Sequence, residues 1–420
     1  MRTRHRARTA WRRWIALPLA LSTAVFVAAC GGSGGSGSSN GPAPIVIGTM
    51  AAVGTPQIDY GGIFAAVKAS ASAINKKGGI HGHPIEVFTC NTQYQATQEL
   101  ACAREAVSKH AVAMIGMNNA LSGTPVENIL SRAHIADIEN TGPLTSSYQG
   151  DNTFPLTWET GSFIPCVSKD LAQKAGADSV VMVHSPTNVA TLFTTLIGNA
   201  ARANGLKFLP PIETSANVSD YSPYVAQAQQ SGAKIVVTLL LGSGPQAFVR
   251  ASGAAGANYA ICTALGLSGS GGFAGLGPAT NQLYLGATFQ PPSQAKSLPL
   301  MQEMLQSMAD EYAAGDKYAD TSPQTFQAQS MGAWLGVQAF AQVANTIKGD
   351  VTADSFLPAI RTAKVDLGGI IPSVDFTQAQ SVGDYQRVYN SDAYLWKWEP
   401  ANSQYLPEGS TQNTLKLALG

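Results

Sequence analysis

The sequence predicts an α/β protein with two doubly wound lobes of parallel sheet. Short β-branched runs alternate with helical patterns, two such series follow one another, and 420 residues are enough for two cores. The alternation begins with a β-branched run at residues 45–47, a helical pattern at 63–75 and another run at 85–88. A strand-helix-strand unit of this kind starts a parallel sheet.

The first series continues in strict alternation. Apolar positions recur at helical spacing in 63–75, and Gly78-Gly79 ends that helix because glycine accepts a left-handed conformation. The remaining elements expected in this series are a helix at 99–109, a strand at 112–116, a helix from 124 and a strand at 135–138.

A second series and a different C-terminal region follow. The second series is expected to contain helices at 164–175, 191–203, 221–230 and 246–251, and strands at 179–183, from 208 until Pro210-Pro211, 234–241, 259–263 and 283–287. Beyond residue 298 we expect longer helices at 298–313, 324–347 and 353–362, then strands at 370–376 and 393–398.

The N-terminus has the pattern of an export signal. Residues 2–13 are basic, and the apolar run at 15–29 is too short for a confident membrane span. It ends in Val27-Ala28-Ala29-Cys30, which resembles a bacterial lipobox, and a Gly/Ser stretch follows. We therefore expect a lipoprotein signal peptide at 1–29, lipidation of Cys30, a tether at 30–43 and an extracytoplasmic, membrane-anchored protein of the cell envelope. The alternatives are an ordinary signal peptide with a chance cysteine and a twin-arginine signal at Arg12-Arg13, whose flanks match poorly.

The charge balance argues against a nucleic-acid partner. Six arginines and no acids precede Cys30, which leaves 20 basic and 26 acidic side chains in the mature chain. Nucleic-acid binding requires a basic face, and this composition does not provide an excess of basic residues.

The segment 44–87 carries a family resemblance. It contains Ile45-Val46-Ile47-Gly48, a glycine-containing loop and a long helix that ends in Ile-Asn-Lys-Lys-Gly-Gly-Ile, followed by Pro-Ile-Glu-Val. This pattern resembles the leucine/isoleucine/valine-binding group of substrate-binding proteins of ABC importers, and the resemblance extends more thinly to residue 398. It implies the type I periplasmic-binding fold, a small-molecule ligand, a membrane permease as partner, a monomer, no cofactor and no enzymatic activity.

The resemblance also implies how the chain is divided. The N-terminal lobe would comprise 44–158 plus 291–372, and the C-terminal lobe 159–290 plus 373–420. Three crossings, near 158–161, 288–292 and 373–376, would form a three-strand hinge.

Four cysteines remain in the mature chain, and exported proteins retain disulfides. Three pairings are possible. Cys90 follows a strand and Cys102 lies in the neighbouring helix, so we expect them to pair, which leaves Cys166 with Cys262 in the second lobe. A bond between the lobes would lock the hinge. Four free thiols are the alternative, and a zinc site is disfavoured because no CxxC spacing occurs.

Ligands of open α/β sheets bind beyond the carboxyl ends of the strands. The loops expected there supply our candidate ligand-binding residues. In the first lobe these are Val53, Gly54, Thr55, Gln57, Asn118, Asn119, Ala120, Asn140, Thr141 and Gly142. In the second lobe they are His184, Thr187, Asn188, Val189, Leu241, Ser243, Ala264 and Leu265.

Other motifs favour no catalytic or metal site. His81 and His83 lie in a Gly/Pro-rich turn, which is more typical of a solvated loop than of a metal pair. Residues 269–274 fit GxGxxA, but no acid follows at the spacing of a dinucleotide fold. Nothing in the sequence links the acids Asp59, Asp137, Glu139 and Glu159 into a catalytic pair.

The candidate loops depart from those of amino-acid binders. Ala264 is placed where the resemblance implies an acid for the α-ammonium, and Val189 and Leu241 stand where aromatic residues are expected. A buried ammonium without a paired charge is costly, so we expect a neutral or singly charged ligand with apolar surface instead of leucine, isoleucine or valine. The alternative is that Glu139 or Glu159 supplies the missing charge.

Two other functional classes remain open in the sequence. A sensory lipoprotein of the same fold would have a signalling partner in place of a permease. An exported α/β hydrolase would need a nucleophile motif such as GxSxG, which the sequence lacks.

Overall fold

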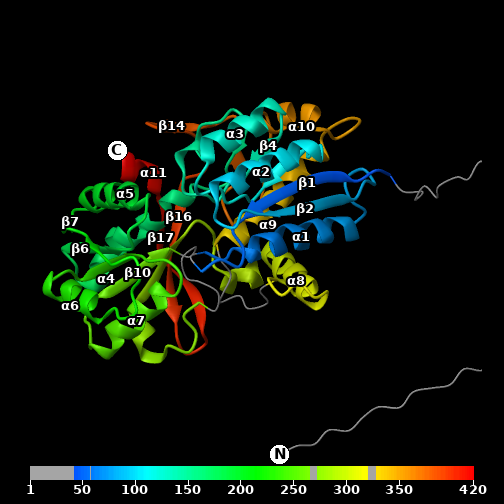
Figure 1. Ribbon diagram of the computed structural model, residues 1–420. Helices are drawn as coiled ribbons and strands as arrows, with labels where there is room; N and C mark the ends of the chain where they lie inside the picture. Colours follow the sequence, from blue (N-terminus) through cyan, green and yellow to red (C-terminus); the bar gives the residue numbers. More distant parts are fainter. Residues whose placement is uncertain (1–41, 57, 265–271, 320–327) are drawn as a thin grey trace, which may run out of the picture. The chain divides into compact units, whose positions relative to one another are not determined.

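The computed structural model describes residues 42–56, 58–264, 272–319 and 328–420, which belong to one compact unit, Pro42–Gly420. Two separate parallel sheets with helices around them confirm the α/β class (Figure 1). No described helix combines the length and the apolar character that crossing a bilayer requires.

The first sheet has five parallel strands in the order β2-β1-β3-β4-β5. Ile45 and Ile47 of β1 are buried in the core on one face of this sheet, and Val46 packs against the core on the other face. The strands are β1 (Ile45–Ala51), β2 (Ile85–Asn91), β3 (Ala113–Ile115), β4 (Ala136–Ile138) and β5 (Thr153–Phe154). The connecting helices are α1 (Gly61–Lys76), α2 (Ala96–Ser108) and α3 (Gly123–Arg132).

The second sheet has the order β17-β16-β11-β10-β9-β6-β7, with β8 also paired to β6. Its strands are β6 (Ser179–His184), β7 (Lys207–Phe208), β8 (Ile212–Glu213), β9 (Ile235–Leu239), β10 (Ala260–Ala264), β11 (Leu283–Ala287), β16 (Asp392–Glu399) and β17 (Gln404–Asn413). Its helices are α4 (Lys169–Ala175), α5 (Ala190–Ala203), α6 (Ser222–Gln230), α7 (Gly244–Ala254) and α11 (Thr414–Leu419). The strands from β6 to β11 are parallel, whereas β16 and β17 add an antiparallel hairpin at one edge.

The C-terminal helices return to the first sheet. Helices α8 (Pro299–Ala313) and α9 (Ala328–Ala344) pack against α1, and α10 (Ala353–Ile360) packs against α9. The hydroxyl of Ser70 on α1 donates to the carbonyl of Trp334 on α9 at 3.0 Å, and both residues are fully buried. Figure 1 shows α8 and α9 next to α1, although more than 200 residues separate them from α1 in sequence.

Three expectations about elements need correction. The segment expected to form one helix at 164–175 forms a 3-10 helix, η2 (Glu159–Val167), and then α4, because the Ser168 side chain caps α4 by accepting from the Leu171 N–H. The strand expected at 370–376 is reduced to β13 (Val374–Asp375), which pairs with β12 (Lys364–Val365). The strand β17 and the short hairpin of β14 (Gln380–Val382) and β15 (Tyr385–Val388) were not expected.

Both expected disulfides are present. Cys90 is bonded to Cys102 and Cys166 to Cys262, with S–S distances of 2.01 and 2.08 Å. The first joins the end of β2 to α2, and the second joins η2 to β10. The predicted lipid-bearing residue, Cys30, lies outside the described residues, as do the signal peptide and most of the tether.

Candidate functional site

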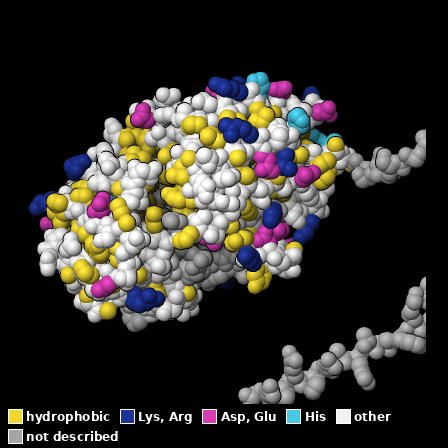
Figure 2. Space-filling model, viewed as in Figure 1, with side chains coloured by type: hydrophobic (Ala, Val, Ile, Leu, Met, Phe, Trp, Pro, Cys, Tyr) yellow, Lys and Arg dark blue, Asp and Glu magenta, His cyan; other side chains and the backbone are white. Residues whose placement is uncertain are grey.

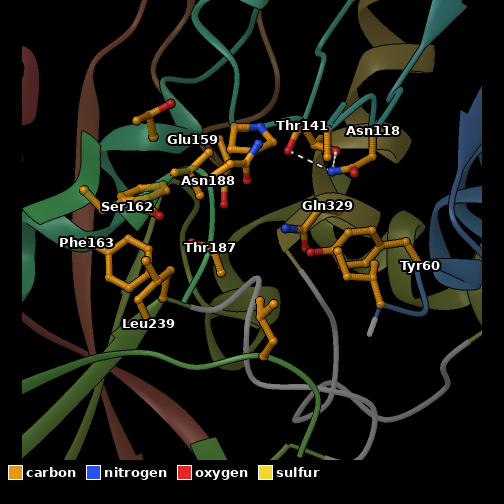
Figure 3. A pocket seen from close by; sticks show the side chains of 18 of the residues that line it. Tyr60, Asn118, Thr141, Glu159, Ser162, Phe163, Thr187, Asn188, Leu239 and Gln329 are labelled. Atoms are coloured by element: carbon orange, nitrogen blue, oxygen red, sulfur yellow. Dashed lines mark hydrogen bonds between the residues drawn. The ribbon is translucent and has the colours of Figure 1, made fainter. Parts of the chain in front are cut away.

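A cavity lies at the carboxyl ends of strands from both sheets (Figure 3). The cavity is partly open to solvent, and its accessible volume is about 100 Å³. Residues from the first sheet and its helices line one side: Ile58, Tyr60, Tyr94, Asn118, Ala120, Thr141, Pro143 and Gln329. The other side is lined by Glu159, Thr160, Ser162, Phe163, Thr187, Asn188, Val189, Phe193, Leu239, Leu241 and Ala264.

Part of the candidate set from the sequence lies at this cavity. Eight candidates line it: Asn118, Ala120, Thr141, Thr187, Asn188, Val189, Leu241 and Ala264. Eight others do not: Val53, Gly54, Thr55, Asn119, Asn140, Gly142, His184 and Ser243. Gln57 and Leu265 lie outside the described residues. Contact between a ligand and any of these residues remains a prediction.

The loop after β1 is held by hydrogen bonds within the loop and to Asn91. The Thr55 hydroxyl donates to the Ile58 carbonyl at 2.5 Å and accepts from the Ile58 N–H at 3.2 Å. The Val53 N–H donates to the Asn91 side chain, whose amide donates back to the Val53 carbonyl. These bonds hold the loop in shape and leave Ile58 and Tyr60 to line the cavity.

Asn140 points into a buried acidic pair that the sequence did not reveal. Its amide donates to Asp137 at 2.9 Å and to Glu127 at 3.3 Å, and its carbonyl oxygen accepts from the Gly142 N–H. Asn152 also donates to Glu127, at 3.4 Å. Burial raises the pKa of Asp137 to about 6 and that of Glu127 well above its usual range, where the neighbouring Asp137 adds to the effect.

The other candidates that miss the cavity have local roles. Nδ1 of His184 lies 3.1 Å from the Ser185 carbonyl oxygen and 4.0 Å from the Glu213 carboxylate. Ser243 is exposed at the start of α7. Asn119 is fully buried, and neither polar atom of its side chain has a hydrogen-bond partner among the described residues.

Glu159 is the one Asp or Glu side chain among the described lining residues. It begins η2 and lies within the crossing predicted at 158–161. Its Oε2 accepts from the Thr288 hydroxyl at 2.9 Å, and its backbone N–H donates to the Tyr148 hydroxyl at 3.1 Å. Burial raises the pKa of Glu159 to about 8, with a further contribution from Glu139, although the Thr288 bond lowers it. Of the two acids that could supply a charge to a ligand, Glu159 is the one that lines the cavity.

Glu139 is directed away from the cavity. Its carboxylate accepts from the N–H groups of Leu156 and Thr157 and from the Thr157 hydroxyl, at 2.5, 3.1 and 2.7 Å. Burial nevertheless raises its pKa to about 7. It therefore fastens the chain after β5 and does not face a ligand.

Several residues that no sequence pattern indicated line the cavity, among them Tyr60, Phe163 and Gln329 (Figure 3). Burial raises the pKa of Tyr60, and Glu159 and Tyr94 raise it further, which places these three groups within electrostatic reach of one another. The Thr187 hydroxyl and Oε1 of Gln329 are buried without a hydrogen-bond partner in the described part of the chain. Such atoms are costly unless a ligand or water bonds to them.

Other chemistry is not indicated in the described regions. No group of three His, Cys, Asp or Glu residues there is arranged to hold a metal ion. His81 is exposed, and Nδ1 of His83 lies 2.7 Å from the Ala43 carbonyl oxygen, within a turn closed by Ile80 and His83. The first half of the 269–274 motif lies outside the described residues.

Comparisons with known proteins agree with this architecture. A family model described as periplasmic binding protein matches residues 44–402. No curated protein sequence matches the chain. A fatty acid ABC transporter substrate-binding protein from Thermomonospora curvata is similar in structure, with a TM-score of 0.70, 13% identity and coverage of 90% of this chain and 95% of that one.

Two further structures show the same fold. A possible leucine/isoleucine/valine-binding protein from Rhodopirellula baltica has a TM-score of 0.71 and 13% identity, covering 89% of this chain and 98% of its own. A solute-binding protein from R. palustris in complex with 4-hydroxybenzoate has a TM-score of 0.67 and 16% identity, covering 88% and 97%. These likenesses confirm the expected type I periplasmic-binding fold.

Proposed function

Because this chain belongs to the periplasmic binding protein family, we propose that it is the solute-binding protein of an ABC importer. It captures one small molecule in the cavity and delivers it to a membrane permease. It acts without catalysis and without a cofactor. The observation that carries the proposal is the cavity itself, which residues of both sheets line and which contains polar atoms without partners.

Binding is coupled to closure of two lobes, 44–158 plus 291–372 and 159–290 plus 373–420. The ligand contacts side chains of both lobes at once only when the lobes are closed, so it shifts the population toward the closed form. The permease then recognises that form.

A thermal-shift screen against metabolites tests ligand capture. A ligand that binds only the folded protein raises the melting temperature, by an amount equivalent to about 2.7 kcal/mol at one hundred times its Kd. Specific stabilisation by at least one small molecule supports the proposal. A broad library in which no compound raises the melting temperature would contradict it.

We further propose a ligand that is neutral or singly charged and has appreciable apolar surface. Phe163, Val189, Leu239 and Leu241 supply apolar walls. Two of the similar structures are a fatty acid ABC transporter substrate-binding protein and a solute-binding protein in complex with 4-hydroxybenzoate. Calorimetry with leucine, isoleucine and valine should therefore detect no micromolar binding. Micromolar binding of any one of them would overturn this proposal.

The protein is anchored to the outer face of the membrane through lipid on Cys30. The lipobox-like sequence before Cys30 and the Gly/Ser stretch after it support this proposal. Cys30→Ser should move the protein from the membrane fraction to the soluble fraction, because a chain that loses its acyl groups loses its anchor. Unchanged membrane retention of the variant would refute the anchor.

A further inference from the structure

We infer that the ligand of this cavity is an organic monocation: an ammonium group on an apolar body, without a carboxylate. The inference rests on the proposed function and names the class of solute that the same cavity selects. The features that favour such a ligand are Glu159, its free oxygen and the aromatic side chains that line the cavity.

The one Asp, Glu, Lys, Arg or His side chain among the described lining residues is acidic. Glu159 lines the cavity, and no Lys, Arg or His does so among the described lining residues. Residue 57 and the stretches 265–271 and 320–327, which are not described, contain no Lys, Arg or His in sequence either. A ligand carboxylate would therefore find no cationic side chain, whereas a ligand cation would find a carboxylate.

Glu159 still has capacity to accept. Its Oε2 accepts a hydrogen bond from the Thr288 hydroxyl, whereas its Oε1 accepts none from the described residues. No described basic side chain forms an ion pair with this carboxylate. Glu159 is half-buried, and a carboxylate in a cavity without a cationic side chain is unfavourable; an ammonium ligand would supply both the hydrogen bond and the charge.

Aromatic faces suit the same cation. Tyr60, Tyr94, Phe163 and Phe193 line the cavity, and the rings of Phe163 and Phe193 pack edge to face with centroids 5.1 Å apart. Figure 3 shows Glu159 and Phe163 on one side of the cavity and Tyr60 on the other. Aromatic rings attract organic cations through their quadrupole, and they also bury the apolar body.

The competing possibility is an anion held by backbone. Helix α5 begins at Ala190 beside the lining residues Asn188 and Val189, and a helix N-terminus attracts a carboxylate. Such an anion would be repelled by Glu159 wherever that carboxyl is ionised, which its pKa of about 8 places at mildly alkaline pH. An amino-acid zwitterion would use both features, so leucine is included in the test.

Binding of a cation at this position should depend on pH. The groups that act on Glu159 are the hydroxyls of Thr288 and Tyr148, the phenol of Tyr60 and the carboxyl of Glu139. Because the pKa of Glu159 is about 8, an ammonium that binds the carboxylate form at neutral pH must displace a proton. Its affinity should rise about tenfold between roughly pH 6 and 7 and then level off as the pH passes the pKa of about 8.

The test uses head groups matched on two apolar bodies. Isoamylammonium, isocaproate, isocaproamide and leucine share one body, and benzylammonium, benzoate and benzamide share the other. Calorimetry on the mature protein at pH 8 should show binding of at least one ammonium, at least about tenfold tighter than its carboxylate and amide counterparts. Failure of both ammonium compounds to bind at millimolar concentration, or tighter binding of a carboxylate or of leucine, would overturn the inference.

Glu159→Gln keeps the shape and the acceptor for Thr288 but removes the charge. This variant should weaken ammonium binding at least about tenfold and abolish the pH dependence of binding. The control variant Glu86→Gln, at an exposed position on β2, should change neither the affinity nor its pH dependence. Unchanged ammonium binding by Glu159→Gln, with an unchanged melting temperature without ligand, would refute the inference. If only carboxylates bind, the cation inference is refuted but the proposed solute-binding function stands. The proposed function fails if no small molecule stabilises the protein.

Discussion

Among the described acids whose pKa values are raised by burial, four lie at the cavity or in the hydrogen-bond networks of the strands that lead to it. Glu127 and Asp137 share the amide of Asn140, Glu139 holds the chain after β5, and Glu159 lines the cavity. Desolvation is the largest cause of each shift. At the scale of single residues, the structure is therefore sensitive to pH in a way that the sequence did not indicate.

The sign of this sensitivity follows from the raised values. An acid whose pKa is higher in the folded than in the unfolded state stabilises the fold while protonated, and that contribution is lost as pH rises toward the folded pKa. Glu139, with an ordinary value of 4.5 and a folded value of about 7, accounts for about 3 kcal/mol. The free energy of unfolding should fall between about pH 4.5 and 8, measured by urea titration without ligand. A rise across this window would contradict the account.

One substitution isolates the acidic pair. Asp137→Asn keeps the volume and the acceptor for Asn140 but removes a titrating carboxyl, so the decline in stability should become shallower. Asp350→Asn, at an exposed position, is the matched control and should follow the unmodified protein.

At the scale of elements, each disulfide fastens a segment that lines the cavity. Cys90–Cys102 closes the connection that contains Tyr94, and Cys166–Cys262 ties η2, with Glu159 and Phe163, to β10. The sequence separations are 12 and 96 residues, so the chain-entropy model assigns about 3 and about 4.7 kcal/mol.

Removal of the two bonds should therefore have unequal effects. Cys166→Ala with Cys262→Ala should lower the free energy of unfolding by more than Cys90→Ala with Cys102→Ala, as measured by urea titration. The first pair should also weaken ligand binding, because η2 carries the most lining residues. A larger loss of stability from the pair at 90 and 102 would show that loop length does not govern the effect.

The sequence predicted most strands and failed where packing overrides local pattern. β1, β6, β9 and β10 are short runs of β-branched residues buried on both faces, and such runs are visible without a structure. β17 was missed because it is largely polar and exposed along an edge. η2 was merged with α4 because Ser168, which caps α4, is not distinctive within a continuous apolar pattern.

The sequence predicted which loops lie at the cavity better than it predicted which residues line it. Asn118, Thr141 and Asn188 follow strands and were expected there, as the rule for parallel sheets implies. Gln329 lies on α9 and Phe163 on η2, and neither is in a loop that follows a strand. Their presence at the cavity therefore depends on tertiary packing. Glu159 could have been favoured from its place at the predicted crossing, but its exposure to the cavity could not be known.

At the scale of the whole described unit, acidic and basic side chains are mixed on the surface. On the face shown in Figure 2, Lys and Arg side chains are interspersed with Asp and Glu and form no extended basic patch. Ion pairs such as Lys68–Asp316 and Lys76–Asp310 join α1 to the end of α8 and the segment that follows it, and each contributes little at the surface. On this face, the mixed charges do not form the basic surface that nucleic-acid binding requires.

The central claim is that one small molecule is held by both lobes at once. Small-angle scattering of the mature protein, with and without a saturating ligand from the thermal-shift screen, tests it most directly. The account predicts a smaller radius of gyration with ligand, because the lobes close around it. A ligand that binds by calorimetry but leaves the radius of gyration unchanged would contradict it.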